Sequence, residues 1–307
     1  MEKRVIVIAG PTCSGKTSLG LQLAQKLKTE IVSADSRQIY KHLTIGTAKP
    51  TKEEQQQVKH HFVDLLNPAE EYNASKFEID GLKVLDNIHT KNKIPIVVGG
   101  SGLYLKALIE GIFNAVDTDE NYRNELLELR KEKGNEFLYD LLVKSDPQSA
   151  EKMLPSNWKR VIRALEVYKL SGKPIRKLQA GYKRKDDYNF LQFALSWERS
   201  QLYKNIENRV DEMIESGLVQ EVREILARGY STQLNSLNTV GYKEIIEHLN
   251  GKISLERAVE LIKRNTRRYA KRQLTWFRKD QNIKWFEVNS AEDVSNIPDM
   301  IITDLGL

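Results

Sequence analysis

Eight consecutive residues near the N-terminus, GPTCSGKT, match the phosphate-binding pattern G-x-x-x-x-G-K-[ST] in full. In such a loop the backbone N–H groups surround phosphate oxygens, and the helix that follows adds its positive end. The lysine supplies a mobile cation, and the threonine hydroxyl can ligate Mg²⁺. The pattern predicts a phosphate site, with a turn that binds nothing as the alternative. Its residues are Gly10, Pro11, Thr12, Cys13, Ser14, Gly15, Lys16 and Thr17.

The loop does not specify which phosphate compound binds. ATP is the default ligand, but no apolar run ends in the Asp-Glu pair that positions Mg²⁺ and water in many NTPases. The apolar run at residues 94–98 is followed instead by the glycine-rich stretch GGSG. This difference lowers the support for an ATPase and leaves a small-molecule kinase open.

Asp35 is a second candidate for chemistry, because it follows the apolar run at residues 31–33. Ser101 follows another such run. The carboxyl ends of parallel strands meet at one edge of a sheet, so both residues should share a cleft with the phosphate loop. A carboxylate beside phosphate is unfavourable unless it accepts a proton or ligates a metal. The alternative is that Asp35 caps a turn, and its position favours neither reading.

The elements that must position these residues follow from the apolar pattern. Leu19, Leu23 and Leu27 recur every fourth residue and predict one face of a helix over residues 16–28. Strands alternating with helices indicate a parallel sheet. The fold class is therefore α/β, with a P-loop NTPase-like parallel sheet core flanked by helices. The expected strands are residues 5–9, 31–33, 94–98, 189–197 and 285–288.

The middle of the chain has a different character. Charged helical segments dominate residues 122–133 and 158–170, and strand-like runs are scarce there. We predict a helical insertion domain at residues 116–188. The P-loop core is then formed by residues 1–115 and 189–307, with basic helices towards its C-terminal end. A length of 307 residues is sufficient for two domains.

A one-sided cationic face is predicted near the C-terminus. At the helical period these side chains cover about half of the circumference, and aromatic residues follow them. Such a face suits a nucleic-acid backbone, and the net charge of +6 agrees with an anionic partner. A solvated charged surface is the alternative. The residues concerned are Lys263, Arg264, Arg267, Arg268, Lys271 and Arg272.

Other features restrict the class of protein. The single cysteine excludes a disulfide framework and a cysteine-based zinc site. No apolar run approaches the roughly 18 residues of a membrane span. The adjacent His60 and His61 would point to opposite faces of a strand, so they make a poor metal chelate. We expect a cytoplasmic monomer without a membrane partner.

Several longer stretches resemble the bacterial tRNA dimethylallyltransferases, also called tRNA isopentenyltransferases. They occur in the family order and span positions 10 to 278. The two stretches DSRQIY and KRQLTWFR are too specific for a generic P-loop protein. The full set is GPTCSGKT from Gly10, DSRQIY from Asp35, IGTAKP from Ile45, HHFVDLLNP from His60, PIVVGGSGLYLKAL from Pro95, RALEVY from Arg163, TVGYKE from Thr239 and KRQLTWFR from Lys271.

The resemblance implies transfer of a dimethylallyl group from dimethylallyl diphosphate to N6 of adenosine 37 in tRNA. The phosphate loop would hold the diphosphate, with Mg²⁺ ligated by Thr17 as the cofactor. Asp35 would accept the N6 proton or orient the amine. Ser101 would lie at the adenine, where the family commonly has threonine. Arg223 would lie near the diphosphate.

The resemblance also implies a tRNA surface. The target adenine must be flipped out of its stack, and the helical insertion would bind the anticodon stem-loop. The implied tRNA contacts are Asp35, Ser36, Arg37, Gln38, Ser101, Lys159, Arg160, Val161, Ile162, Arg163, Thr239, Val240, Gly241, Tyr242, Lys243, Glu244, Lys271, Arg272, Gln273, Trp276 and Arg278.

Three other functions remain as alternatives. A P-loop small-molecule kinase would transfer phosphate and would not need the basic face. An adenylate prenyltransferase acting on free AMP would share the phosphate loop and Asp35 but would lack an extended tRNA surface. A non-catalytic RNA-binding protein would not depend on Asp35.

Overall fold

The structure is a computed structural model that describes residues 2–112, 119–180, 182, 184 and 187–307. The chain divides into two compact units, Met1–Ile109 with Asp186–Leu307, and Glu110–Lys185. The predicted boundary at 115/116 lies outside the described residues. The predicted boundary at 188/189 falls within a strand of the first unit. The second unit therefore starts and ends a few residues earlier than expected.

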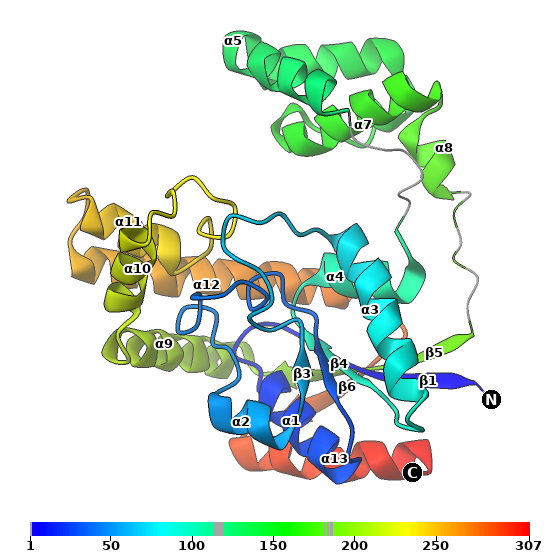
Figure 1. The fold of residues 1–307 in the computed structure, drawn as a ribbon, viewed down its shortest axis with the longest axis vertical. Helices are drawn as coiled ribbons and strands as arrows, with labels where there is room; N and C mark the ends of the chain where they lie inside the picture. Colours follow the sequence, from blue (N-terminus) through cyan, green and yellow to red (C-terminus); the bar gives the residue numbers. More distant parts are fainter. Residues whose placement is uncertain (1, 113–118, 181, 183, 185–186) are drawn as a thin grey trace. The chain divides into compact units, whose positions relative to one another are not determined.

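The first unit is built on a six-stranded sheet with the order β3-β2-β4-β1-β5-β6, and all its pairings are parallel. The central strand is β1, whose Ile6 lies opposite Ile96 on one side and Leu191 on the other. The predicted P-loop NTPase-like α/β class is confirmed (Figure 1). The short strand β3 was not predicted. The strands are β1 (Lys3–Ala9), β2 (Ile31–Ser33), β3 (His60–His61), β4 (Ile96–Gly99), β5 (Tyr188–Trp197) and β6 (Ile283–Val288).

Helices cover both faces of this sheet. On one face lie α1 (Lys16–Lys26) and α13 (Ala291–Leu305), and on the other lie α3 (Ala74–His89) and α4 (Gly102–Glu110) (Figure 1). The predicted leucine face of α1 buries Leu19 and Leu23 against the sheet and α13. This packing fixes the start of α1, and with it the phosphate loop, against the end of β1.

A group of helices lies beyond the carboxyl ends of the strands (Figure 1). Within this group α9 and α11 both pack against α12, and α10 contacts α9 and α11. These helices therefore stand beside the phosphate loop, which follows β1. The bounds are α2 (Lys52–Gln57), α9 (Arg199–Glu215), α10 (Leu218–Ala227), α11 (Tyr242–Leu249) and α12 (Leu255–Phe277).

The second unit is helical throughout its described part and has a core of its own. Leu126, Leu138 and Leu142 of its first helix pack with Val161 and Leu165. Gly134, with φ 86° and ψ 179°, interrupts the first helix. The elements are α5 (Glu120–Ser145), α6 (Pro147–Ala150), the 3₁₀ turn η1 (Pro155–Asn157), α7 (Trp158–Ser171) and α8 (Ile175–Ala180).

No helix among the described residues is both long and apolar enough to cross a membrane.

Candidate active site

The phosphate loop leads from β1 directly into α1. Gly15 has φ 88°, in the left-handed region that favours glycine, and it forms the N-cap of α1. Lys16 folds back over the loop, where its Nζ donates to the carbonyl oxygen of Pro11 at 3.0 Å. Removal from water and, to a smaller extent, the positive charge of Arg209 lower the pKa of Lys16 to about 8. The loop therefore places a desolvated cation, Lys16, beside a curved stretch of backbone of the kind that binds phosphate.

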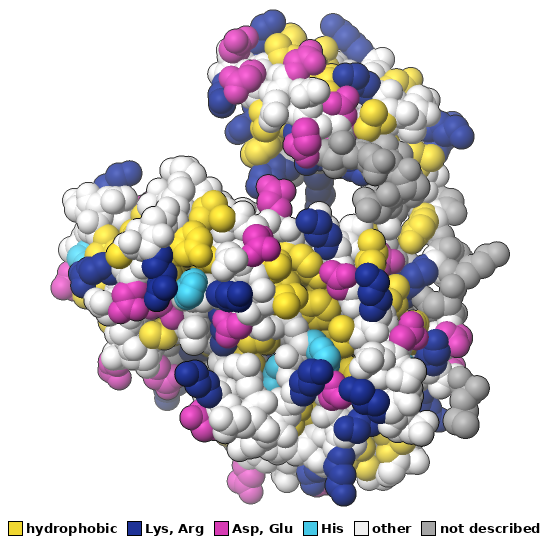
Figure 2. Space-filling model, viewed as in Figure 1, with side chains coloured by type: hydrophobic (Ala, Val, Ile, Leu, Met, Phe, Trp, Pro, Cys, Tyr) yellow, Lys and Arg dark blue, Asp and Glu magenta, His cyan; other side chains and the backbone are white. Residues whose placement is uncertain are grey.

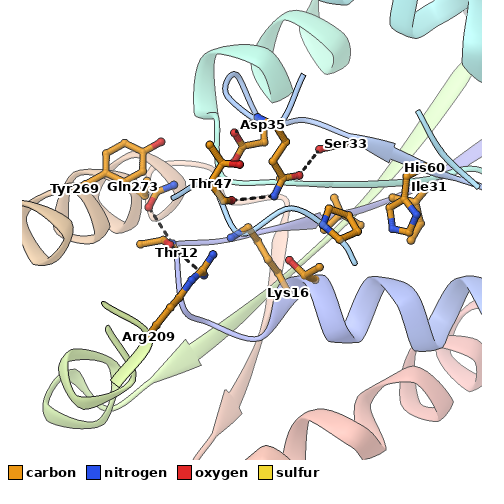
Figure 3. Close-up of a pocket in the computed structure, with 15 residues that line it drawn as sticks. Thr12, Lys16, Ile31, Ser33, Asp35, Thr47, His60, Arg209, Tyr269 and Gln273 are labelled. Carbon is orange, nitrogen blue, oxygen red and sulfur yellow. Dashed lines mark hydrogen bonds between the residues drawn. The ribbon is translucent and has the colours of Figure 1, made fainter. Parts of the chain in front are cut away.

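Asp35 caps a turn and also lines a cavity. Its Oδ1 accepts hydrogen bonds from the backbone N–H groups of Arg37 at 2.8 Å and Gln38 at 3.3 Å, so the residue does cap a turn. Its Oδ2 accepts no hydrogen bond from the described residues. Asp35 lines a cavity together with Lys16 and Thr17 (Figure 3). One oxygen therefore anchors the side chain, and the other is available to a ligand.

The glycine-rich stretch after β4 allows a close approach to the strand that carries Asp35. A Cβ at Gly99 would lie 2.2 Å from the carbonyl oxygen of Ala34, a backbone atom that cannot move aside cheaply. The N–H of Ser101 donates to that same oxygen at 3.3 Å. Ser101 therefore stands next to the Asp35 turn, but it is not among the residues that line the two cavities described below, so a cleft shared with the phosphate loop stays a prediction for this residue.

Gln273 connects α12 to the phosphate loop. Its Oε1 accepts from the N–H of Thr12 at 3.0 Å (Figure 3), and its Nε2 donates to the carbonyl oxygen of Gly100 at 2.8 Å. The side chain is buried, so the predicted tRNA contact at Gln273 is corrected to a link inside the protein. The exposed Trp276, one turn further along α12, packs its indole ring against Gly102.

The arginine beside the phosphate loop is Arg209, not Arg223. Arg209 lies on α9, and its Nη1 is 3.5 Å from Thr12 Oγ1 and 3.7 Å from Cys13 Sγ. Arg223 is exposed on α10, where it donates to Gln220 at 3.0 Å, and it is not among the residues that line either cavity. The assignment from the sequence is corrected, because the fold turns the other arginine towards the loop.

Two adjoining cavities meet at Asp35. The first is a largely polar cavity that contains the phosphate-loop side chains Lys16 and Thr17 and extends to His60 (Figure 3). The second has a volume of about 370 Å³ and a largely apolar wall.

Tyr269 lines both cavities. Burial and the negative charge of Asp35 raise the pKa of Tyr269 to about 12, so its hydroxyl stays protonated. Residues that line both cavities are Thr12, Asp35, Thr47, Arg209 and Tyr269.

The carboxylate of Glu221 holds the segment that contains Gly46, a residue of the second cavity wall. It accepts hydrogen bonds from the backbone N–H groups of Thr44 at 3.0 Å, Ile45 at 2.7 Å and Gly46 at 3.3 Å. It also accepts from the hydroxyl of Tyr242 at 2.6 Å. Glu221 thereby connects residues 44–46 to Tyr242, which are far apart in the sequence.

The stretch TVGYKE contributes to the second cavity only in part. Thr239, Val240, Gly241 and Lys243 line it. Tyr242 and Glu244 are buried at 0% and 2% exposure, so they are corrected from tRNA contacts to structural groups. Glu244 accepts from the N–H of Gly241 at 2.8 Å and from Nδ2 of Asn265 at 2.7 Å.

The basic face of α12 is smaller than the sequence indicated. Lys263 pairs with Asp211 at 2.7 Å, and Arg267 pairs with Glu207 at 2.7 Å, so α9 neutralises one part of the face. Basic and acidic side chains are also interspersed on the face of the first unit that Figure 2 shows. The exposed cations on or next to the C-terminal half of α12 are Arg268, Lys271, Arg272, Arg278 and Lys279.

The predicted tRNA contacts on α7 also divide into two groups. Lys159 and Arg160 are exposed. Val161 and Ile162 are buried at 0% and 4% exposure in the core of the helical unit, and this contradicts their assignment as tRNA contacts. Arg163 pairs with the buried Glu166 at 2.6 Å.

The adjacent histidines do not form a metal site. His61 Nε2 lies 2.8 Å from Glu30 Oε2, whereas His60 Nδ1 lies 2.7 Å from the carbonyl oxygen of Val58. Burial lowers the pKa of both rings. Among the described residues, no three His, Cys, Asp or Glu side chains come together as a metal cluster.

Comparison with known proteins gives a consistent picture over the whole chain. The model of the family described as "IPP transferase" matches residues 38–280. A tRNA dimethylallyltransferase of Carboxydothermus hydrogenoformans is 43% identical, with 100% of this chain and 99% of the relative covered. One of Thermotoga neapolitana is 45% identical, with 99% of this chain and 100% of the relative covered.

Solved structures agree with these relatives. The tRNA isopentenylpyrophosphate transferase of Bacillus halodurans has a TM-score of 0.73 at 38% identity, with 99% of this chain and 97% of that chain covered. A eukaryotic dimethylallyltransferase acting on tRNA has a TM-score of 0.80 at 31% identity, with coverages of 98% and 80%. The chain therefore belongs to the IPP transferase family.

Proposed function

We propose that this chain transfers a dimethylallyl group from dimethylallyl diphosphate to N6 of adenosine 37 in tRNA. The observation that carries the proposal is the meeting of a phosphate cavity and an apolar cavity at one carboxylate, Asp35. A prenyl diphosphate has a charged end and an apolar end, and this pair of cavities matches both. The named relatives support the same reaction.

In the proposed reaction Asp35 accepts the proton, and Lys16 and Arg209 stabilise the leaving group. The bond between C1 of the prenyl group and the diphosphate oxygen breaks, and its electron pair leaves with the diphosphate. The new bond forms between C1 and N6 of the adenine, and the N6 proton moves to Oδ2 of Asp35. Lys16, Arg209 and the loop N–H groups stabilise the negative charge that grows on the leaving diphosphate.

The phosphate loop also fits Mg²⁺. Thr17 lines the cavity next to Lys16 and presents a hard hydroxyl ligand, the type that Mg²⁺ prefers. When bound there, the ion would neutralise charge on the diphosphate. In the proposed reaction Thr17 holds the ion, while Lys16 and Arg209 contact the diphosphate directly.

The tRNA is assigned to the surface around the second cavity. Arg272 lines this cavity and is exposed, and Arg268 lies one turn away on the same helix. Lys159 and Arg160 offer a further basic surface on the helical unit, which we assign to the anticodon stem-loop. A prenyltransferase for free AMP would not need these cations, and a kinase would not need the apolar cavity. Both alternatives are therefore less well supported.

The deciding experiment offers the full chain two acceptors in separate reactions. With Mg²⁺ and labelled dimethylallyl diphosphate, we expect label on an anticodon stem-loop that carries adenosine 37 and none on free AMP. Label on AMP alone would favour the adenylate prenyltransferase. Phosphate transfer from ATP without prenylation would favour the kinase.

Replacing Asp35 tests its role as the proton acceptor. Asp35→Asn keeps an acceptor oxygen for the N–H groups of Arg37 and Gln38, so the turn should persist. It cannot take up a proton at Oδ2, so transfer should fall by about 10²- to 10⁴-fold. Binding of the stem-loop, measured by a filter or fluorescence assay, should change little. A normal transfer rate in Asp35→Asn would show that another group accepts the proton.

The lowered pKa of Lys16 predicts an alkaline limit to activity. Lys16 is charged below its pKa of about 8 and neutral above it, so kcat/KM for dimethylallyl diphosphate should decline as pH rises through that value. Lys16→Arg keeps its charge, so any activity that remains should lack this alkaline decline. A wild-type profile that is flat to pH 10, with the diphosphate donor below its KM, would contradict the prediction.

The exposed cations predict how tRNA binding depends on salt. Removing charge in Arg268→Gln/Arg272→Gln should lower the slope of log K against log salt by about 0.7–0.9 for each lost phosphate contact. Lys263→Gln is the matched control, because Lys263 already pairs with Asp211. An equal change of slope in the control would assign the effect to overall charge instead of this face.

A further inference from the structure

On the basis of the proposed function, we propose that Met213 restricts the prenyl donor to a five-carbon chain. In this proposal its side chain forms the part of the cavity wall that the end of the prenyl chain meets, one helical turn beyond Arg209 on α9. Met213 would then be a specificity-determining residue for the length of the prenyl group.

One face of α9 lines the second cavity. Ile206, Arg209, Val210 and Met213 all contribute to its wall, and their spacing of three and four residues places them on one side of the helix. Arg209 marks the phosphate end of this face, because it reaches Thr12 and Cys13. Met213 lies four residues beyond Arg209, or about 6 Å along the helix axis.

The wall around this part of the cavity suits a hydrocarbon. Val240 and Ile262 line the cavity together with the apolar residues of α9. A prenyl chain whose diphosphate is held at the loop can bury its methyl groups against these side chains, which removes apolar surface from water. The chain would extend along α9 from Arg209 towards Met213.

A third cavity adjoins the apolar one. It has a volume of about 860 Å³ and a mostly apolar wall that also includes Asn205, Asn208 and Glu212, and it extends to Gly15 of the phosphate loop. The residues that line both this third cavity and the apolar one are Cys13, Arg209 and Met213.

These three shared residues form the partition between the two cavities. Arg209 is held at the phosphate loop, and Cys13 is part of that loop. Met213 is the one long apolar side chain of the three, so it is the residue that faces the methyl groups of the bound chain. In this proposal a ten-carbon chain needs the space of the third cavity and reaches it only when the Met213 side chain is displaced.

The side chain of Met213 can be shortened with little risk to the fold. Met213 is partly exposed. Met213→Ala should therefore connect the apolar cavity to the third cavity without opening a void in a core. Hydrophobic pockets discriminate by about 10- to 200-fold for each methylene that does not fit.

The test compares two donors with the full-length chain, Mg²⁺ and the anticodon stem-loop. Wild-type protein should use dimethylallyl diphosphate and should transfer very little from geranyl diphosphate. In Met213→Ala the ratio of kcat/KM for the ten-carbon donor to that for the five-carbon donor should rise by about tenfold or more. Met213→Val, with a shorter branched side chain, should give an intermediate ratio.

The matched control is Met300→Ala. Met300 is 53% exposed on α13 and lines none of the three cavities, so its loss should leave the donor ratio unchanged. Thermal melting of each variant verifies that it is folded.

The outcomes separate the two proposals. Wild-type protein that uses both donors equally, or folded Met213 variants whose ratio stays at the wild-type value, would overturn the role of Met213. In both cases five-carbon transfer to the stem-loop would still stand. A wild-type chain that transfers neither donor would overturn the proposed function itself.

Discussion

The two hydrogen bonds of the Gln273 amide unite the parts of the site that come from separate elements. The loop after β1, the glycine turn after β4 and the C-terminal part of α12 meet at this buried side chain. An unpaired buried amide is costly, so the three segments hold one arrangement. The same helix carries the exposed Arg272 at the second cavity. A nucleic acid that binds to α12 would therefore act on a surface rigidly connected to the phosphate loop.

Much of the sheet and its catalytic edge could be predicted, because those features depend on local patterns. The phosphate loop is a contiguous motif, and Asp35 and Ser101 follow strands whose apolar runs are visible in the sequence. Parallel pairing then brings their backbones together, and the N–H of Ser101 donates a hydrogen bond to the carbonyl oxygen of Ala34, the residue before Asp35. The two-residue strand β3 was missed, since two histidines carry no strand signal.

Features that depend on tertiary contacts could not be predicted. The choice of Arg209 over Arg223 depends on which face of α9 and α10 turns inward. The partial neutralisation of the basic face comes from Asp211 and Glu207, which are more than fifty residues from their partners. Val161 and Ile162 lie in a basic stretch, yet the amphipathic period of α7 buries them. A motif identifies a stretch, whereas packing decides which of its side chains face a ligand.

The pairing of β1 with β5 has a consequence for the synthesis of the chain. Lys3 lies opposite Tyr188, so the central sheet joins the beginning of the chain to a segment that follows the whole helical unit. The helical unit packs mainly through neighbouring helices and needs no such distant partner. On the ribosome, it should gain its structure while the first strand still lacks a neighbour on one side. The phosphate loop would then reach its final geometry only after the later strands and α12 have emerged.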